Sequence, residues 1–353
     1  MSGSHIDFAS RVVAWQKVHG RNDLPWQNTR DPYRVWLSEV MLQQTQVATV
    51  RTYFMRFLER FPDVNRLAEA TLDEVLGLWS GLGYYSRARN LHRCAQLIMV
   101  EHHGAFPQQA RTLETLPGIG RSTAAAIASL CFGERVAILD ANVKRVLTRV
   151  LGFDADLALA VNERALWDAA TFILPAHQVS AANMAGYTQG MMDLGAMVCL
   201  PKNPLCRTCA VRPECKAAAQ GDPLRYPVRS RKVRRSSEFL WLLRLRAPDG
   251  SVWLRKRPEP GVWAGLYCLP WFESEQRVRG ALSADLKDRL RTLPAFRHVL
   301  THKDLHLHPC AVNLPDTSTC WGEGRWVTSH EWPNLGLPAP IRTLLATPDD
   351  VST

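Results

Sequence analysis

The sequence predicts a multidomain fold, with an all-α domain followed by a smaller α/β domain. The chain has 353 residues, which is enough for two hydrophobic cores. Up to about residue 197 the apolar residues recur at helical spacing, as in 72–79 and 184–197. From residue 237 onward short apolar runs appear instead. Two of them, 239–243 and 252–254, flank a Pro-Asp-Gly turn in the manner of a β-hairpin.

Composition marks the boundary between the domains. Residues 221–236 combine two prolines with six arginine or lysine residues, which is typical of a solvated linker. Such a basic segment could also lie along a phosphate backbone. We therefore expect an α-helical domain at 1–220 and a second domain at 237–346. Within the second domain the pattern places further strands and helices at 278–290, 296–300, 305–312 and 340–345.

Charge and cysteine content narrow the class of protein. Lys and Arg number 43 against 33 Asp and Glu, a formal net charge of +10 that favours a polyanionic partner, although ribosomal and membrane-surface proteins share it.

Residues 1–8 lack the apolar stretch of a signal peptide, and no run approaches the roughly 20 apolar residues of a membrane span. Nine cysteines, four of them clustered, indicate metal binding in a reducing compartment. We expect a cytoplasmic protein with no membrane partner.

One acidic residue interrupts an apolar helix near the N-terminus. Asp31 and Pro32 form a helix start, with Asp as N-cap, and the helix is expected to continue through Gln46. Glu39 has apolar residues one turn before and after it. Burial should therefore raise its pKa and let it act as a general acid, although a surface glutamate is the plainer alternative. The polar residues 43–46 offer donors and acceptors suited to base edges.

A helix-hairpin-helix is expected at about 113–130, where Leu-Pro-Gly-Ile-Gly separates two helical patterns. Gly118 and Gly120 leave backbone N–H groups uncovered in the turn. Ser122 or Thr123 could cap the second helix. The N-terminus of that helix then suits a phosphate.

Several polar residues have both a structural and a functional interpretation. Asp140 follows an apolar run and could cap the helix 143–150 or take part in chemistry. Gln189 and Asp193, one helical turn apart, form either a satisfied buried pair or the wall of a pocket. Tyr84 lies in a Gly-rich turn followed by arginines, which suits insertion between bases or a helix end with packed aromatics.

Four cysteines give the most specific signal. They are spaced C-x6-C-x2-C-x5-C within seventeen residues. Four thiolates so close can ligate zinc or an iron–sulfur cluster, and zinc ribbons usually present two C-x2-C knuckles where this chain has one. The expected ligands are Cys199, Cys206, Cys209 and Cys215.

Together these motifs resemble the endonuclease III superfamily of DNA glycosylases, and over nearly the whole chain the MutY family of adenine DNA glycosylases. The resemblance implies a [4Fe–4S] cluster on the loop 199–215. It also implies removal of adenine mispaired with 8-oxoguanine or guanine in double-stranded DNA, after the base has left the stack. By the resemblance, Glu39 protonates adenine at N7, Asp140 stabilises the cationic sugar, and Asn142 supports Asp140. The position of Asp140 at a helix N-terminus should favour its ionised form.

The resemblance also assigns substrate contacts. It places Trp26, Gln27 and Gln189 around adenine and Gln44 and Tyr84 beside 8-oxoguanine. Further DNA contacts are expected at Gln43, Gly118, Gly120, Ser122, Thr301 and His302.

The second domain resembles the Nudix fold, but 274–290 lacks the acidic box that binds Mg²⁺. Two residues depart from the family pattern. Leu300 replaces an aromatic residue of the lesion-sensing loop, and Ala141 replaces a glycine beside Asp140.

Ser122 occupies the position of the lysine that forms a Schiff base in strand-cutting relatives. We therefore expect a monofunctional glycosylase, monomeric and associated with a bacterial-type nucleoid. Three rival interpretations are a bifunctional endonuclease acting on damaged pyrimidines, a non-catalytic iron–sulfur DNA-binding protein, and a nucleotide hydrolase.

Overall fold

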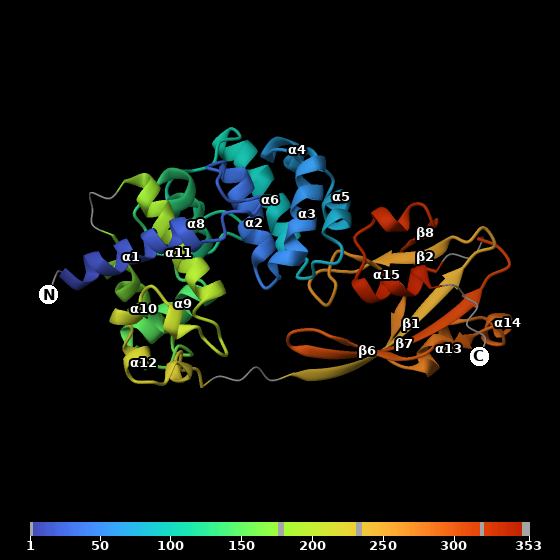
Figure 1. Cartoon of the computed structure of the whole chain (residues 1–353). Helices are drawn as coiled ribbons and strands as arrows, with labels where there is room; N and C mark the ends of the chain where they lie inside the picture. Colours follow the sequence, from blue (N-terminus) through green and yellow to red (C-terminus); the bar gives the residue numbers. More distant parts are fainter. Residues whose placement is uncertain (1–2, 176–179, 231–234, 318–320, 348–353) are drawn as a thin grey trace. The chain divides into compact units, whose positions relative to one another are not determined.

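The computed structural model describes residues 3–175, 180–230, 235–317 and 321–347. The chain forms two compact units (Figure 1). The first contains Met1–Ala68 and Arg93–Lys232, and the second contains Glu69–His92 and Val233–Thr353. No helix in the described ranges has the length and apolarity that a membrane crossing requires.

The first unit is helical, as the sequence predicts. Its central helix is α11, which packs against α1, α8 and α9. Their shared core includes Val12, Leu139, Leu147 and Met191. The helices are α1 Gly3–His19, α2 Pro32–Leu42, α3 Val47–Arg60, α7 Ala110–Leu113, α8 Arg121–Phe132, α9 Ala141–Leu151, α10 Ala160–Phe172, α11 Ala181–Met197 and α12 Lys216–Ala219, with α4 Val64–Glu69 and α6 Ser86–His102 each crossing the division between the units.

Helices α9 and α11 approach each other closely at a glycine. A Cβ at Gly195 would lie 2.6 Å from the Cβ of Asn142 and 3.0 Å from its carbonyl oxygen. The absence of a side chain at Gly195 therefore lets α11 lie directly against the first turn of α9.

The second unit is built around a mixed sheet. Strands β1 Ser236–Arg246 and β7 Lys303–Asn313 pair in parallel along their whole length. Antiparallel neighbours flank this pair, and α5 Leu72–Trp79 belongs to the same unit. The other elements are β2 Val252–Lys256, β3 Tyr267–Cys268, β4 Trp271–Phe272, β5 Arg291–Thr292, β6 Phe296–Val299, β8 Arg325–Val327, α13 Glu275–Ala281, α14 Ala284–Lys287 and α15 Ala339–Ala346.

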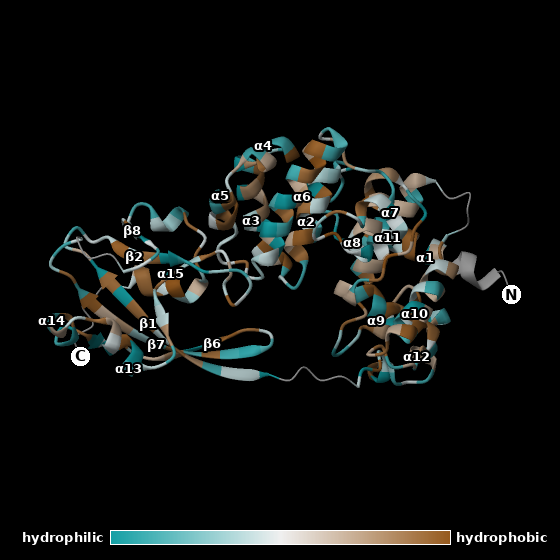
Figure 2. Ribbon diagram, turned by 180° about the vertical axis from the view of Figure 1, so that it is seen from behind, coloured by the Kyte–Doolittle hydropathy of each residue, from teal (hydrophilic) through white to brown (hydrophobic). Residues whose placement is uncertain are grey.

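Alternation along the two long strands separates the faces of the sheet. Apolar and polar residues lie side by side on β1 and β7, as hydropathy colouring shows (Figure 2). Leu243, Leu245 and Val312 form a core with Val278 and Leu282 from the α13 region. The predicted strands at 239–243, 252–254, 296–300 and 305–312 and the helix at 340–345 are therefore confirmed.

Three local expectations were wrong. The helix that begins at Pro32 ends at Leu42 rather than at Gln46, because the chain turns at Gln44, whose φ is 57°. The helix expected at 278–290 is divided into α13 and α14 by extended backbone at Leu282. The N-cap of α8 is Gly120, which has no side chain to cap with, rather than Ser122 or Thr123.

The first half of the expected linker is part of the first unit. Tyr226 is buried, and its carbonyl oxygen accepts a hydrogen bond from Arg149 Nε at 3.3 Å. Leu157 N donates to Val228 O at 3.1 Å, and Ser230 N donates to Asp156 Oδ1 at 3.1 Å. Residues 223–230 are therefore not a solvated connector, while 231–234 lie outside the described residues.

Candidate active site

Glu39 lies on α2 in an apolar setting. Asp31 caps this helix by accepting a hydrogen bond from Tyr33 N at 3.0 Å, as the sequence predicts. The residues just before Glu39, among them Trp36 and Leu37, are fully buried, and Glu39 itself is partly buried. The pKa of Glu39 is raised to about 7, mainly by burial and to a smaller extent by the negative charge of Asp140, while the charge of Arg21 lowers it. The expected raised pKa is thus present in the structure.

Asp140 is the N-cap of α9 and follows the buried run Ala137–Leu139. Its Oδ1 accepts a hydrogen bond from Val143 N at 2.7 Å, and its Oδ2 accepts one from Asn142 Nδ2 at 3.2 Å. These bonds favour the carboxylate, but burial has the larger effect, so the pKa of Asp140 is raised. The sequence predicted that the helix N-terminus would favour ionised Asp140. This effect is present, but its influence on the pKa is smaller than that of burial. Ala141 is the exposed first residue of α9 and takes helical geometry without difficulty.

The two carboxyl groups influence one another. The negative charge of Asp140 raises the pKa of Glu39, so protonation of one favours ionisation of the other. Asp140 has two hydrogen-bond donors that stabilise its carboxylate. These contacts favour the proton on Glu39 and the charge on Asp140. A pair of this kind can supply one acid and one anion.

Arg145 ties Asp140 to the cysteine segment. Its Nη2 donates to Asn142 Oδ1 at 2.9 Å and to Gly195 O at 2.6 Å, and its Nε donates to Cys199 O at 2.6 Å. Because Asn142 in turn donates to Asp140, a continuous chain of hydrogen bonds joins Asp140 to Cys199. The sequence analysis did not find Arg145, because its partners lie up to 54 residues away along the chain.

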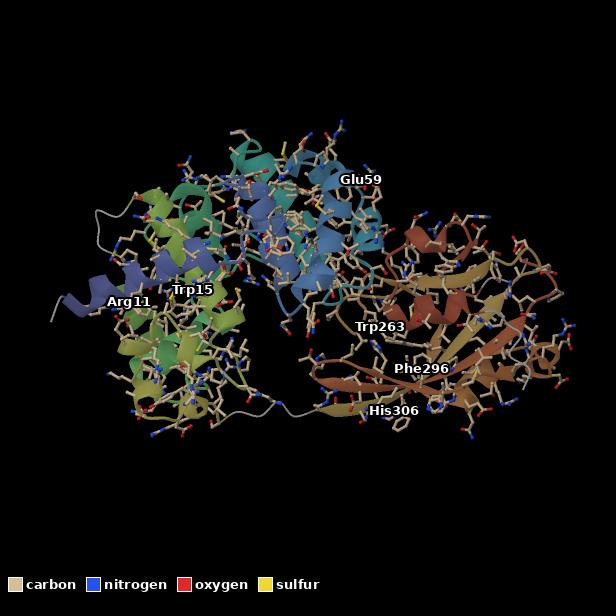
Figure 3. All side chains as sticks on the ribbon, viewed as in Figure 1. Arg11, Trp15, Glu59, Trp263, Phe296 and His306 are labelled. Carbon is tan, nitrogen blue, oxygen red and sulfur yellow. The ribbon has the colours of Figure 1, made fainter. Side chains whose placement is uncertain are left out.

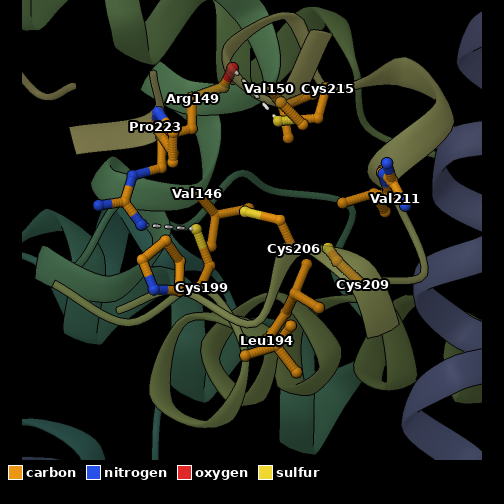
Figure 4. Close-up of a pocket in the computed structure, with 14 residues that line it drawn as sticks. Val146, Arg149, Val150, Leu194, Cys199, Cys206, Cys209, Val211, Cys215 and Pro223 are labelled. Atoms are coloured by element: carbon orange, nitrogen blue, oxygen red, sulfur yellow. Dashed lines mark hydrogen bonds between the residues drawn. The ribbon is translucent and has the colours of Figure 1, made fainter. Parts of the chain in front are cut away.

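The four clustered cysteines line one cavity (Figure 4). Burial raises the pKa of Cys209 to about 11 and also raises that of Cys215, so a nearby positive charge is needed to hold these sulfurs as thiolates. Arg149 supplies one cation, since its Nη1 donates to Cys199 Sγ at 3.2 Å. No group of three or more His, Cys, Asp or Glu side chains in the described ranges is arranged around a single metal ion. Four cysteine sulfurs that line one cavity are the kind of ligand set that holds an iron–sulfur cluster or a zinc ion.

A second cavity of about 390 Å³ contains the residues expected around adenine. Trp26, Gln27 and Gln189 all line it. Gln189 Nε2 donates to Asp193 Oδ1 at 3.0 Å, and Arg21 Nε donates to the same oxygen at 2.7 Å. Gln189 and Asp193 are thus a satisfied buried pair, and Gln189 is also part of a pocket wall. Gln27 Oε1 is buried and has no hydrogen-bond partner in the described part of the chain, so a ligand donor would satisfy it.

Two hydrogen bonds join the start of α8 to the segments that carry Glu39 and Asp140. Gln43 Nε2 donates to Thr123 Oγ1 at 3.5 Å, which links the end of α2 to the start of α8. Ser122 Oγ accepts a hydrogen bond from Leu139 N at 3.3 Å, directly before Asp140. Gly118 has a φ of 77°, a conformation that favours glycine. Ser122 therefore fixes the approach to Asp140 instead of capping a helix.

The second unit has its own cavity of about 490 Å³. It is lined by residues 81–86 and Arg89, and by Trp263, Ala264 and 298–302. Tyr84 Oη and Thr301 Oγ1 share a short hydrogen bond of 2.5 Å. Thr301, His302 and Tyr84 are therefore brought together, as the resemblance implies, and Leu300 lines the same cavity.

Trp263 and His298 also line this cavity but were missed by the sequence analysis. Only the Gly/aromatic composition of 261–267 signalled a special loop there. Gln44 belongs to the first unit and does not line the cavity of the second.

Comparison with known proteins identifies the family. Residues 37–169 match the HhH-GPD superfamily of base excision DNA repair proteins, and residues 241–347 match the NUDIX domain. An adenine DNA glycosylase of Buchnera aphidicola subsp. Acyrthosiphon pisum is 37% identical and aligns over 96% of each chain. This chain belongs to the adenine DNA glycosylase family. The human adenine DNA glycosylase is 34% identical, over 95% of this chain and 72% of its own.

Solved structures agree with this adenine DNA glycosylase fold. A thermostable thymine-DNA glycosylase aligns with a TM-score of 0.54 and 27% identity over 61% of this chain and 97% of its own. A trapped endonuclease III–DNA covalent intermediate aligns with a TM-score of 0.50 and 21% identity, over 62% and 98% respectively, which bears on the fold alone. The expected helix-hairpin-helix and Nudix-like folds, and base excision repair by an adenine DNA glycosylase, are confirmed at the level of the family.

Replacing Arg149 by methionine should destabilise the first unit. Arg149 is 2% exposed and donates to Leu200 O at 2.7 Å as well as to Tyr226 O, so its loss leaves buried acceptors unpaired. We expect a loss of about 2–4 kcal/mol in the free energy of unfolding. Denaturant unfolding followed by circular dichroism measures it, with the exposed Arg207→Met as the matched control. Equal stability of the two variants would contradict a structural role for Arg149.

Proposed function

We propose that this protein removes adenine from DNA where adenine lies opposite 8-oxoguanine or guanine, and that it leaves the strand intact. The observation that carries the proposal is the raised pKa of Glu39, to which the charge of Asp140 contributes, together with the two hydrogen bonds that stabilise the carboxylate of Asp140. A glycosidic bond breaks readily when one group protonates the departing base and another stabilises the positive sugar. The family of the chain supplies the base, adenine.

The proposed reaction begins with adenine extruded from the helix, because its glycosidic bond is inaccessible inside the duplex. Glu39 donates its proton to N7 of the ring. The bond between C1′ and N9 then breaks, and its electron pair stays with adenine. The Asp140 carboxylate faces the oxocarbenium-like sugar and stabilises its charge, electrostatically or covalently. A water molecule finally supplies hydroxide to C1′ and returns a proton to Glu39.

Adenine would enter the cavity beside α2. Trp26 offers an aromatic face, and Gln189 offers an amide held in place by Asp193. The unpaired Gln27 Oε1 would accept a hydrogen bond from the exocyclic amino group of adenine. A cavity of about 390 Å³ leaves ample room for one purine.

The opposite base would be recognised by the second unit. Tyr84 and Thr301 present two hydroxyl groups joined by a hydrogen bond at the edge of a cavity. His302 lies next to them on the exposed turn between β6 and β7, and the turn of Gln44 in the first unit would contact the same base. Because Leu300 stands where the family has an aromatic residue, ring stacking at this position is lost. Hydrogen bonds would therefore contribute the larger part of the recognition.

The remaining contacts concern the duplex and the organisation of the protein. Gly118 and Gly120 would hold a phosphate at the N-terminus of α8, helped by the net charge of +10 and by Gln43. We place the glycosylase domain at 1–220 and the lesion-recognition domain at 237–346. We further propose a monomer that acts on nucleoid DNA in a bacterial-type cytoplasm.

Cys199, Cys206, Cys209 and Cys215 would hold a [4Fe–4S] cluster, whose chemistry here is to cross-link the loop 199–215 and fix its shape. Arg149 would offset the negative charge of the ligating sulfurs. The hydrogen bonds of Arg145 would transmit the position of Cys199 to Asn142 and so to Asp140.

The decisive assay of this function uses the purified protein and duplexes that differ only at one pair. We expect excision of adenine opposite 8-oxoguanine and opposite guanine, and none of cytosine opposite 8-oxoguanine. The strand should stay intact until alkali or heat is applied, because Ser122 cannot form a Schiff base. Cleavage without such treatment, or release of damaged pyrimidines, would favour the bifunctional rival. DNA binding without excision would favour the non-catalytic one.

The pH dependence of excision tests the role of Glu39. Protonated Glu39 is the active form, so the single-turnover rate should fall about tenfold per pH unit above a pH of about 7. The rate should fall again at acid pH, where Asp140, whose pKa is raised, takes up a proton and loses its charge. Glu39→Gln, which cannot donate a proton, should lose excision while still binding the duplex. The exposed Glu59→Gln on α3 is the matched control and should keep the wild-type profile. Full excision by Glu39→Gln would point to another acid.

Elemental analysis tests the proposed cluster. We expect about four iron atoms per chain in the wild type and a marked loss in Cys209→Ala, which removes one ligand. Cys131→Ala removes a buried cysteine outside the cavity and should retain the iron. One zinc atom per chain in place of iron would contradict the proposal.

A further inference from the structure

A row of aromatic rings continues the face of the sheet that packs against α13 and ends in exposed residues. In the parallel pairing of β1 with β7, Phe239 lies opposite His306 and Trp241 lies opposite His308. Residues two apart on a strand project to the same side, so all four rings share one face. On β4, Phe272 lies opposite Trp241 and extends the row.

The rings form a continuous stack. The centroids of Phe239 and His306 are 4.6 Å apart with an interplanar angle of 15°, and those of Trp241 and His308 are 4.5 Å apart at 13°. Phe239 and His308 are 6.1 Å apart at 29°, which joins the two pairs. His308 Nε2 is buried without a hydrogen-bond partner in the described residues, so His308 contributes mainly through its ring. His306 forms the end of the stack.

The end of the stack is open and lies beside a cation. Phe239 is 53% exposed, and His306 is partly exposed. Arg297 on β6 lies opposite His306 in the register and is exposed on the same face. The one carboxylate in this part of the face, Asp304, is neutralised by Arg235 Nη2 at 2.5 Å.

The sequence adds more positive charge at the entry to β1. Residues 229–235 contain five cations in seven positions, and they precede the strand that carries Phe239. Arg297, exposed and opposite His306 in the register, places a positive charge beside the aromatic stack, which complements a polyanion.

This face is distinct from the lesion cavity. His298 and Trp263 line that cavity, whereas His306 belongs to the opposite side of the strands by alternation, as its side chain shows (Figure 3). Buried leucines such as Leu240 and Leu305 lie on the same side of the strands as His298, opposite the aromatic stack. The catalytic steps proposed above make no use of the aromatic stack.

We propose that this face binds single-stranded DNA, with one unpaired base continuing the ring stack at His306 and Phe239. The cation Arg297 takes a neighbouring phosphate. Base stacking on aromatic side chains beside a basic groove is the usual basis of single-strand binding. A duplex is excluded because its bases are already stacked on both faces. The proposal is independent of adenine excision.

The test measures binding of a fluorescein-labelled oligothymidylate of 12 nucleotides by anisotropy. The full-length protein is used with its duplex site filled by an unlabelled abasic duplex. Because Phe239→Ser removes a ring on which a base would stack, it should weaken binding of the oligonucleotide about fivefold or more. Phe239→Tyr keeps the ring and should bind like the wild type. Arg297→Gln should weaken binding and reduce its salt dependence. Excision of adenine should be unchanged in all three variants.

A matched control and a local readout make the result decisive. Phe172→Ser removes a phenylalanine that is 72% exposed on α10 of the first unit and should leave binding unchanged. Photo-crosslinking with 5-iodouracil in the oligonucleotide should label the peptides that contain Phe239 or His306. Equal affinity of Phe239→Ser and wild type, or crosslinks confined to the first unit, would overturn the proposal. Loss of self-association in Phe239→Ser by sedimentation would overturn it in favour of a contact between copies.

Discussion

Burial of two carboxyl groups that influence one another is the constraint on which the chemistry of this protein depends. Either group alone in an apolar setting would take up a proton and become inert as an anion. The two groups differ because Asp140 accepts two hydrogen bonds that stabilise its carboxylate, whereas the apolar surroundings of Glu39 favour its protonated form. At neutral pH these differences favour a proton on Glu39 and a carboxylate at Asp140.

The position of Asp140 is maintained from both sides. Ser122 holds the backbone before it through Leu139, and the first turn of α9 holds the carboxylate after it. Arg145 extends this support to the carbonyl groups of Gly195 and Cys199. The cysteine segment, whose cysteines do not line the cavity of Trp26 and Gln189, is therefore linked to Asp140 by hydrogen bonds. The second unit carries a separate set of rings and hydroxyl groups, with two faces that serve different purposes.

Much of this arrangement follows from short-range sequence patterns. Asp31 before Pro32, and Asp140 before an amphipathic run, are local capping signals, and both caps form as predicted. The strands at 239–243 and 305–312 were found because a short apolar run and an alternating pattern are also local signals. The raised pKa of Glu39 was predictable because its apolar neighbours lie within one helical turn.

Sequence reasoning failed where the deciding contact is distant or depends on backbone geometry. The end of α2 was misplaced because the left-handed turn at Gln44 has no glycine to announce it. The roles of Arg145 and Arg149 depend on carbonyl groups of another segment, which have no sequence signature. The burial of Tyr226 was missed because its proline-rich, basic surroundings indicate exposure. Tertiary packing outweighs composition in that segment.

The close approach of α9 and α11 has an evolutionary consequence. Gly195 touches neither of the proposed substrate bases, yet a methyl group there would collide with Asn142, the residue that donates to Asp140. A substitution of Gly195 would therefore impair the protein much as a substitution of Asn142 would, although Gly195 lies on a supporting helix. Natural selection should treat position 195 as strictly as it treats the acid and the anion themselves.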